Sequence, residues 1–398
     1  MRIVLTGGGT AGHVIPFEPL IESLRALFLE KHAKLPAFVD PQELELSFLG
    51  VVDLRTQELF ATYDVPVTHI PSGKLRRYVS GSGLNIIDLL FRLPLGVCLA
   101  LYQLWKIMPD VVISKGGFGS VPVVMAAAFY RIPILLHESD ARPGLANKKM
   151  LPFAAIIAVG FENTRQYLGK WQYKMFVTGT PIRTQIAAVP SAEARKSLAI
   201  PAGERVLLVV GGSQGAKQLN EVLLKVLPAL IQKMTIIHIT GEEHYPAVFT
   251  IASELLASSD RKNLYKPFDY LDSTRIAMAL AAADGVVSRA GSMLAEIAHL
   301  RKPALLIPLA TSAGDHQRTN AQAFEAAGAA LVLDPNNLGE NIFRQNVETL
   351  MFNDDVRTSL QKNAELMDVP DASRKIAHLA FQLAQGLAPQ KSSAAQTA

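Results

Sequence analysis

Three glycine-rich segments follow apolar stretches and precede helical patterns, and their residue types suit the binding of phosphate groups. They read GGGTAG at 7–12, GGSQG at 211–215 and SRAGS at 288–292. Glycines allow tight turns and a close backbone approach, and a helix N-terminus presents unpaired N–H groups to an anion. Ser213 adds a hydroxyl, although a plain helix N-cap would explain that serine equally well. Together the three loops predict an anion site at the carboxyl ends of strands.

Two further side chains could carry proton transfer. His13 directly follows the first loop, where an imidazole at the mouth of an anion site is well placed to act as a base. Asp140 ends the polar run HESD at 137–140, behind an apolar stretch. Each residue has a structural alternative, because His13 could cap or pack a helix and Asp140 could be an N-cap. We predict catalysis or direct substrate contact for His13.

Polar residues that follow later apolar stretches could bind a sugar. Glu296 lies one turn into the helical pattern after 288–292, where a carboxylate either favours the helix dipole or binds a ribose diol. His316, Gln317 and Asn320 follow the apolar stretch 304–307 and could hydrogen-bond sugar hydroxyls.

Several cofactor and metal classes lack their sequence signatures. The first loop formally fits the dinucleotide pattern G-x-G-x-x-G, but an acidic residue is missing from the end of the second strand, since Asp53 comes late. No HExxH motif, no closely spaced His and Asp set with the spacing of metal ligands and no Gly-Lys-Ser/Thr phosphate loop occurs. We therefore predict no metal and no cofactor, and we do not expect an ATPase.

Short apolar strands alternate with helical stretches along the chain, which predicts parallel sheets covered on both faces. The pattern breaks in a turn-rich segment at 179–190 and then restarts. The predicted fold class is α/β, with Rossmann-like doubly wound domains at 1–182 and 183–370, a C-terminal helix at 371–387 and a disordered tail at 388–398. The expected strands lie at 2–5, 46–49, 111–114, 132–136, 155–159 and 175–177, and then at 205–210, 235–239, 285–287, 304–307 and 330–333.

Length and composition limit the class of protein. The chain has 398 residues, of which 49% are hydrophobic and 19% charged, enough for two large cores. The single cysteine, Cys98, excludes an internal disulfide and fits a reducing compartment. The net charge of +4 is too small to imply nucleic-acid binding and fits an anionic partner, such as a diphosphate or an acidic lipid surface. The apolar strand expected at 2–5 runs directly into glycines, so we expect no signal peptide there and a cytoplasmic protein.

A basic and apolar region at 74–97 has two interpretations. Lys74, Arg76 and Arg77 precede a stretch rich in Ile, Leu and Phe. Basic residues beside exposed apolar ones form an interfacial membrane site, whereas a core helix behind a solvated basic loop gives the same pattern. The window 84–101 contains two charged residues and a proline, so we do not expect a membrane-spanning helix there.

Seven blocks of sequence resemble those of the MurG family, the UDP-N-acetylglucosamine:undecaprenyl-pyrophosphoryl-MurNAc-pentapeptide N-acetylglucosaminyltransferases of bacterial cell-wall synthesis. The blocks occur in the order of the family and cover nearly the whole chain. They are GGGTAGHVIP (7–16), SKGGFGSVP (114–122), HESDARPGLANK (137–148), VTGTPIR (177–183), VVGGSQGAKQLN (209–220), SRAGSMLAEI (288–297) and GDHQRTNAQAFEAAGAA (314–330). The resemblance implies a GT-B fold, in which two Rossmann-like domains surround a central cleft.

The resemblance also implies roles for residues of the C-terminal domain, which would hold UDP-GlcNAc. Ser213 and the loop 288–292 would lie at the diphosphate, and Glu296 at the ribose. The further donor contacts implied by the family are Gly291 and Ser292 in that loop, the backbone near Phe268 at the uracil, Gln317 and His316 at the GlcNAc hydroxyls, and Arg183 at the nucleotide side of the cleft.

The implied chemistry is a single inverting displacement. The N-terminal domain would present Thr10, Ala11, Gly12 and His13 to the acceptor and the leaving phosphate. The C4 hydroxyl of MurNAc would attack the anomeric carbon of GlcNAc while a base removes its proton and UDP leaves, giving a β-1,4 linkage. His13 is the predicted base and Asp140 the competitor. A metal is unnecessary where helix N-termini and loop N–H groups neutralise the departing diphosphate.

The lipid-linked acceptor implies a peripheral enzyme on the cytoplasmic face of the cell membrane, with 74–97 at the anionic inner surface. A place in a complex of cell-wall enzymes would fit the same location. Two other functions remain open at this point. One is a UDP-GlcNAc 2-epimerase, which shares the fold and the donor but acts on a soluble sugar. The other is a non-catalytic, membrane-associated nucleotide-sugar binding protein; an NAD-dependent dehydrogenase is a distant third.

Overall fold

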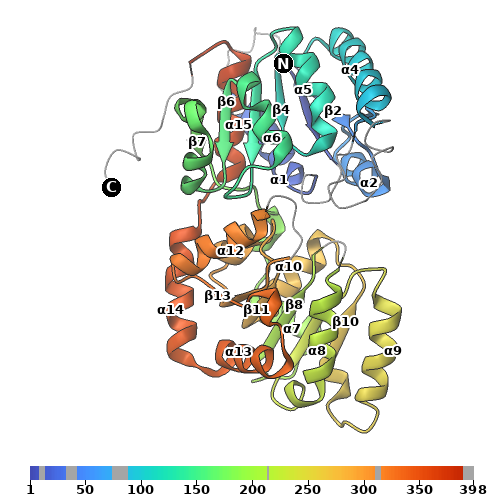
Figure 1. Cartoon of the computed structure of the whole chain (residues 1–398), viewed down its shortest axis with the longest axis vertical. Coiled ribbons are helices and arrows are strands. Elements are labelled where there is room, and N and C mark those ends of the chain that lie inside the picture. The colour runs from blue at the N-terminus through green and yellow to red at the C-terminus, as the bar shows by residue number, and fades with distance from the viewer. Residues whose placement is uncertain (9–13, 33–42, 74–87, 213–214, 310–314, 389–398) are drawn as a thin grey trace. The chain divides into compact units, whose positions relative to one another are not determined.

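The computed structural model describes residues 1–8, 14–32, 43–73, 88–212, 215–309 and 315–388 (Figure 1). The chain divides into two units. The first unit comprises Met1–Pro181 together with the C-terminal segment from Asp371, and the second comprises Ile182–Pro370. The chain therefore leaves the first unit once, builds the second and returns.

The first unit is built on a seven-stranded parallel sheet with the order β3-β2-β1-β4-β5-β6-β7. The order reverses between β1 and β4, which pair directly. In open parallel sheets, ligands bind outside the carboxyl ends of the strands at such a switch point. The strands are β1 (Arg2–Gly7), β2 (Glu45–Gly50), β3 (Val67–His69), β4 (Val111–Ser114), β5 (Ile134–Glu138), β6 (Ile156–Val159) and β7 (Met175–Val177).

Helices cover both faces of this sheet. They are α1 (Phe17–His32), α2 (Leu54–Thr62), α4 (Leu93–Ile107), α5 (Val121–Phe129), α6 (Leu145–Met150) and α15 (Ala372–Ala384). Alternate residues of β1 point to opposite sides, so Ile3 and Leu5 join the core beneath α1, α2 and α15, while Val4 joins the core beneath α4 and α5.

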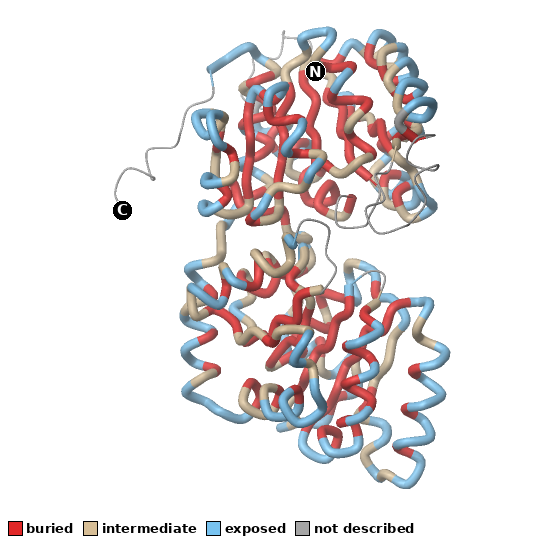
Figure 2. The backbone as a smooth tube through the Cα atoms, in the orientation of Figure 1, coloured by how far each residue is buried: buried red, intermediate tan, exposed pale blue. Residues whose placement is uncertain are grey.

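The second unit repeats the arrangement with a six-stranded parallel sheet in the order β10-β9-β8-β11-β12-β13. Its order reverses between β8 and β11. The strands are β8 (Val206–Val210), β9 (Thr235–Ile239), β10 (Tyr265–Phe268), β11 (Gly285–Ser288), β12 (Ala304–Leu306) and β13 (Leu331–Val332). The helices are α7 (Ser191–Ser197), α8 (Lys217–Leu230), α9 (Tyr245–Leu255), α10 (Ser273–Ala282), α11 (Leu294–His299), α12 (His316–Ala326), α13 (Glu340–Phe352) and α14 (Asp354–Ala364). Figure 2 shows the buried strands at the centre of each unit.

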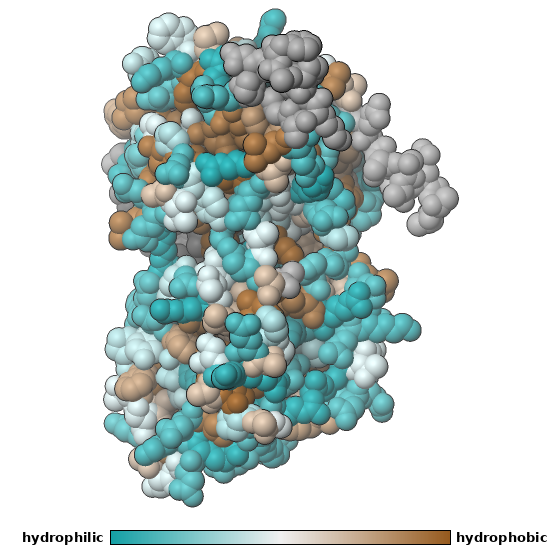
Figure 3. Space-filling model, turned by 180° about the vertical axis from the view of Figure 1, so that it is seen from behind, coloured by the Kyte–Doolittle hydropathy of each residue, from teal (hydrophilic) through white to brown (hydrophobic). Residues whose placement is uncertain are grey.

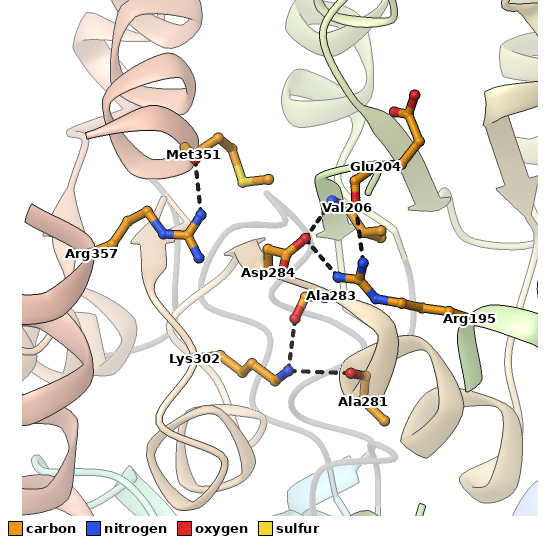
Figure 4. A network of polar contacts seen from close by, with 9 residues as sticks. All are labelled: Arg195, Glu204, Val206, Ala281, Ala283, Asp284, Lys302, Met351 and Arg357. Atoms are coloured by element: carbon orange, nitrogen blue, oxygen red, sulfur yellow. Dashed lines mark hydrogen bonds and ion pairs between the residues drawn. The ribbon is translucent and has the colours of Figure 1, made fainter. Parts of the chain in front are cut away.

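Charged residues tie the amino edge of the second sheet together (Figure 4). Asp284, just before β11, accepts hydrogen bonds from the Arg195 guanidinium and from the N–H of Val206, both at 2.8 Å. Lys302 donates to the carbonyls of Ala281 and Ala283 near the end of α10. Asp284 and Lys302 thus provide hydrogen-bond partners for main-chain groups at the edge of the sheet opposite the glycine loops. A lysine that binds the last carbonyls of a helix, as Lys302 does at α10, also interacts favourably with the helix dipole.

The prediction of two doubly wound parallel sheets is confirmed, and the observed strands differ from the expected ones mostly by one or two residues at their ends. Two strands, β3 and β10, were not predicted. The final helix was predicted as a segment outside both domains, whereas α15 packs against α1 in the first unit. Periodicity indicates that a helix exists but does not indicate which core it joins.

The helix that includes α4 is long and apolar. Leu90–Ile107 has the length and composition of a membrane span, and 17% of that segment is buried. Its inner face packs against α5 through Gly96, Ala100 and Leu104. No spanning helix was predicted from the window 84–101, and the packing of this inner face is that of a surface helix on a folded unit.

Candidate functional site

The switch point of the second unit carries the second glycine loop. Gly211 and Gly212 follow β8, and Ser213 lies outside the described residues. Gly215 closes the turn by donating its N–H to the Gly212 carbonyl at 3.0 Å. A Cβ on Gly215 would lie 2.3 Å from the Thr240 carbonyl oxygen, at a φ of +76°. Only glycine fits this position, so the loop is held against the end of β9.

A buried polar chain supports the same loop from below. Asn220 of α8 donates to the Thr240 carbonyl at 3.0 Å, and its Oδ1 lies 3.0 Å from His238 Nε2. His238 Nδ1 in turn lies 2.8 Å from the Tyr265 hydroxyl. Burial lowers the pKa of His238 to about 3, so the ring is neutral and links its neighbours as a hydrogen-bonding spacer. Sequence reasoning did not identify this support.

The loop after β11 lies beside it on the sheet. Ser288 ends the strand, and Asn320 of α12 donates to the Ala290 carbonyl at 3.0 Å. Gly291 has open space where a Cβ would be, and Ser292 is exposed. The predicted contacts Gly291 and Ser292 therefore lie at the carboxyl edge, but the Gly291 N–H already donates to the Arg289 carbonyl at 2.9 Å.

Glu296 is buried and paired. It lies in the first turn of α11, and both of its carboxylate oxygens accept hydrogen bonds from Arg183 Nη1 at 2.9 Å. The Arg183 and Glu296 side chains are only 12% and 7% exposed. The structure thus brings together two predicted nucleotide contacts that are 113 positions apart in the sequence.

Two other predicted donor contacts are engaged by the chain itself. Gln317 Oε1 accepts the Leu309 N–H at 2.9 Å, which orients this amide and leaves its Nε2 donors for a ligand. The Phe268 carbonyl accepts both the N–H and the hydroxyl of Thr240, at 2.9 and 3.2 Å. His316 begins α12, directly after the undescribed residues 310–314. Gln317 and His316 therefore lie together at the end of the β12 connection.

The switch point of the first unit carries the first glycine loop. Gly8 has a φ of +110°, and a Cβ on it would lie 2.5 Å from the Val51 carbonyl oxygen. The backbone is thus packed tightly against the end of β2 as the loop begins. The predicted residues Thr10, Ala11, Gly12 and His13 lie outside the described residues.

Beside that loop, a buried lysine connects the ends of β4 and β5. Lys115 Nζ lies 2.6 Å from His137 Nδ1 and also donates to the Ser139 hydroxyl. His137 Nε2 lies 2.9 Å from the Gly179 carbonyl, so Nε2 carries the proton and Nδ1 accepts from the lysine. Burial, followed by the Lys115 charge, holds the pKa of His137 well below its usual value. This histidine is neutral and structural.

Glu138 organises the segment that carries Asp140. Its carboxyl group accepts the Asp140 and Gly144 N–H groups, both at 3.0 Å, and the Asn147 side-chain amide at 2.8 Å. Burial and the nearby Asp140 charge raise the pKa of Glu138 to about 7. Burial lowers the pKa of Lys115 to about 7, against the opposing effect of the Glu138 and Asp140 charges. Asp140, the predicted alternative base, is therefore held close to a buried lysine.

Lys115 is a functional candidate that sequence reasoning missed, and Glu138 was noted only as part of the polar run at 137–140. Both lie inside blocks quoted for the family resemblance, at 114–122 and 137–148. The available signal was a charged residue at the carboxyl end of an apolar strand, next to glycines or polar residues. Among the described residues, no group of three or more His, Cys, Asp or Glu side chains is placed to hold a metal ion.

Two family domains cover most of the chain. The glycosyltransferase family 28 N-terminal domain matches residues 3–159, and the C-terminal domain of the same family matches residues 206–376. The chain belongs to glycosyltransferase family 28. The two matched domains correspond to the two units that carry the two switch points.

Curated and solved relatives of this family 28 chain agree with that assignment. A protein of Bacillus anthracis, named UDP-N-acetylglucosamine–N-acetylmuramyl-(pentapeptide) pyrophosphoryl-undecaprenol N-acetylglucosamine transferase 2, is 37% identical over 91% of this chain and 95% of its own length. The crystal structure of Acinetobacter baumannii MurG has a TM-score of 0.68 at 22% identity, over 96% of this chain and 99% of its own. The predicted membership of the MurG family and the predicted glycosyltransferase activity are confirmed.

The same fold also occurs in epimerases. The structure of a UDP-GlcNAc 2-epimerase from Neisseria meningitidis bound to UDP-GlcNAc has a TM-score of 0.64 at 15% identity, over 95% of this chain and 99% of its own. At that identity the likeness concerns the fold alone. The epimerase alternative is not favoured, since the curated relatives at higher identity are transferases.

Proposed function

We propose that this family 28 enzyme transfers GlcNAc from UDP-GlcNAc to the C4 hydroxyl of MurNAc in undecaprenyl-pyrophosphoryl-MurNAc-pentapeptide. The observation that carries the proposal is the 37% identity to the Bacillus anthracis transferase over 91% of the chain. Glycine loops at the switch points of both sheets support it, because these loops are where doubly wound domains bind phosphorylated ligands.

The second unit supplies the donor site in this proposal. Backbone N–H groups of the loops after β8 and β11, with Ser213, would stabilise negative charge on the departing diphosphate. Such donors are fixed before the reaction and require no reorganisation. Glu296 would accept the ribose hydroxyls, and Gln317 Nε2, with His316, would donate to the GlcNAc.

The first unit supplies the acceptor site and the base. The acceptor oxygen forms a bond to the anomeric carbon of GlcNAc as the bond from that carbon to the diphosphate oxygen breaks. The proton of the C4 hydroxyl passes to the base, for which we propose His13, and UDP leaves with the bonding electron pair. Asp140 is the alternative base, and its position depends on Glu138, which accepts its N–H.

The decisive experiment measures transfer of labelled GlcNAc from UDP-GlcNAc to a lipid-linked muramyl-pentapeptide, with and without EDTA. We expect transfer that depends on the acceptor and is unchanged by EDTA, because main-chain donors replace a metal. Release of UDP without the lipid acceptor would favour the epimerase instead. Binding of UDP-GlcNAc without turnover would favour a non-catalytic role.

We also propose that the outer face of α4 rests on the anionic cytoplasmic surface of the membrane. Leu95, Leu99, Tyr102 and Trp105 follow helical spacing and are 38–64% exposed, and Phe129 of the adjacent α5 is 74% exposed. Hydrophobic residues gather over part of the surface of the first unit (Figure 3). Apolar side chains of this face, together with the basic residues Lys74, Arg76 and Arg77 that precede it in the sequence and lie outside the described residues, would anchor a peripheral protein.

The membrane proposal has its own test. Changing Arg76 and Arg77 together to Glu should weaken binding to vesicles that contain anionic lipid, since each basic residue near such a surface contributes about 1 kcal/mol. Vesicle sedimentation measures the effect. Unaltered partitioning of the double variant would contradict the proposal.

A further inference from the structure

The Arg183–Glu296 pair has an unusual geometry. Both hydrogen bonds to the carboxylate come from a single guanidinium nitrogen, Nη1, which lies 2.9 Å from each oxygen. An arginine that recognises a carboxylate through its fork would use two nitrogens in parallel. Here Nη1 lies equally far from the two oxygens and holds the carboxylate group in place, while each oxygen keeps further acceptor capacity.

One hydrogen-bond donor of Arg183, its Nε, is buried where a ligand cannot reach it. Its Nε is buried without a hydrogen-bond partner, and the side chain as a whole is 12% exposed. A buried donor without a partner is costly, so the placement of this guanidinium is determined by the contact at Nη1. Arg183 itself has an extended backbone and lies at the start of the second unit, which begins at Ile182. Arg183 is therefore built to hold Glu296.

We propose that Arg183 is a positioning residue, which keeps the buried Glu296 carboxylate charged and oriented so that it accepts the two ribose hydroxyls of the donor. This inference rests on the proposed function, in which Glu296 receives the ribose. It changes the role predicted for Arg183 from the sequence, because the nucleotide contact is made through Glu296.

The physical reason is the cost of a buried charge. The Glu296 side chain is 7% exposed, and a carboxylate at that depth keeps its charge only with a close cation or several donors. Without the guanidinium, the carboxyl group would take up a proton or turn toward other donors. Either change weakens the acceptor that the ribose needs and leaves the diphosphate loops in place. Loss of Arg183 should thus reduce selectivity for the ribose rather than nucleotide binding in general.

The experiment compares two ligands that differ by one hydroxyl. Dissociation constants of UDP and 2′-deoxy-UDP are measured by calorimetry on the full chain. We expect the native enzyme to bind UDP about 10- to 100-fold more tightly than 2′-deoxy-UDP, as for a hydrogen bond to a charged acceptor. Arg183→Gln should reduce that ratio to about one, mainly by weakening UDP. Glu296→Gln should reduce it in the same way.

A conservative variant separates positioning from other roles. Arg183→Lys keeps a positive charge on a slightly shorter side chain, whose ammonium nitrogen can still approach the Glu296 carboxylate, so it should restore most of the ratio that Arg183→Gln loses. An arginine that gripped the diphosphate through its fork would not be replaced by lysine. The matched control is Arg195→Gln, which breaks the Arg195–Asp284 pair at the opposite edge of the same sheet. The control should lower thermal stability and leave the ratio unchanged.

The outcomes distinguish the inference from the function on which it rests. Failure of the native chain to bind UDP would contradict the proposed function. A native ratio of one would overturn the inference while the diphosphate site stands. The positioning role would be overturned by an Arg183→Gln variant that keeps the native ratio, including one whose affinities for UDP and 2′-deoxy-UDP both fall by the same factor. If Arg183→Gln does not fold, a folded Arg183→Lys protein with a ratio of one would overturn it as well.

Discussion

Lys115 and Glu138 are the buried ionisable groups that set the electrostatics of the first unit's switch point. They are 5% and 6% exposed and lie at the ends of neighbouring strands. Glu138 fastens the Asp140 segment, and Lys115 connects His137 with Ser139. The polar run at 137–140 could be recognised from its place after an apolar strand. The burial of these residues could not be predicted from the sequence, since it depends on the helices packed above them.

The raised pKa of Glu138 predicts a pH dependence of stability. Between pH 4.5, its ordinary value, and about 7, its pKa in the folded protein, the unfolded chain releases a proton that the folded chain retains. Stability must therefore fall as pH rises through this window. Glu138→Gln cannot ionise, so it should remove a fall on the order of 1–3 kcal/mol. Denaturant unfolding at pH 4.5 and 7 measures the difference between the two proteins.

A control separates this effect from any general loss of a carboxylate. Glu162→Gln removes an exposed carboxylate of the same unit, paired with Arg165, and should leave the pH profile of the native protein unchanged. The pKa of Lys115 is about 7 in the folded protein, so its titration makes stability depend on pH only above pH 7, outside the range from pH 4.5 to 7. A Glu138→Gln protein with the native slope between pH 4.5 and 7 would show that Glu138 titrates normally.

The choice of base gives a second prediction. His13→Ala should lower turnover about 100-fold or more and leave UDP binding nearly intact, since a general base acts on the proton of the acceptor. Asp140→Asn should lower turnover less, because its backbone contact to Glu138 is retained. Steady-state transfer rates with matched UDP calorimetry test both variants. Near-normal turnover of His13→Ala would remove that residue from the mechanism.

Long-range partners mark the limit of prediction at this scale. From its place one turn into a helix, Glu296 could either favour the helix dipole or bind a ribose, and the family resemblance implied the ribose; this role stays a prediction. Its partner Arg183 lies 113 positions earlier, and no spacing rule connects the two. The His238–Asn220 contact was likewise invisible, since it joins a helix to a strand that lies later in the sequence.

Strand, glycine turn and helix form the element that recurs at each switch point. The central strands were predictable because parallel strands buried on both faces are continuous apolar runs. The edge strands β3 and β10 were not. β3 has three residues, and β10 contains Pro267 and a lysine, which edge strands tolerate and central strands do not.

The turn at Gly215 should be intolerant of any side chain. Gly215→Ala would place a Cβ 2.3 Å from the Thr240 oxygen, so the loop must shift away from β9. We expect UDP affinity to fall about tenfold or more, because loop N–H groups act only when aligned. Gly203→Ala is the matched control, with a φ of +80° but open space at the Cβ position. It should cost about 1 kcal/mol of stability and leave UDP affinity unchanged. Equal loss of UDP affinity in the two variants would show that the loop at 211–215 has no specific role in UDP binding.

The exposed face of α4 leads to a prediction about vesicle binding. Trp105→Ser removes a 64% exposed ring and should weaken binding to anionic vesicles about tenfold or more, through the lost apolar contact. Phe249→Ser removes a 48% exposed ring from α9 of the second unit and serves as the control. Sedimentation with vesicles measures both variants, and equal effects would argue against a specific α4 surface.

At the scale of the whole molecule, each unit has its own core although the chain passes between them twice. Residues Ile376, Ala380 and Phe381 of α15 are fully or almost fully buried in the core that α1 and β1 share. The exposed Arg374–Glu30 ion pair adds a contact at the edge of this packing. The last helix therefore completes the first unit, so a chain that ends at 370 would expose one face of it. The local sequence pattern predicted this helix, but the unit against which it packs depends on the apolar surface that α1 leaves uncovered.

A matched pair of core truncations tests this division. Phe381 and Phe343 are both fully buried, the first in α15 of the first unit and the second in α13 of the second. Each Phe→Ala change should cost about 3–5 kcal/mol, but in different units. Hydrogen exchange should speed up in β1 and β4 for Phe381→Ala, and in β8 and β11 for Phe343→Ala, because opening reports the stability of the local cooperative unit. UDP affinity should survive the first change and weaken with the second, since the donor loops belong to the unit whose core Phe343 fills. Faster exchange in β8 and β11 of the Phe381→Ala protein would mean that the two units share one cooperative core.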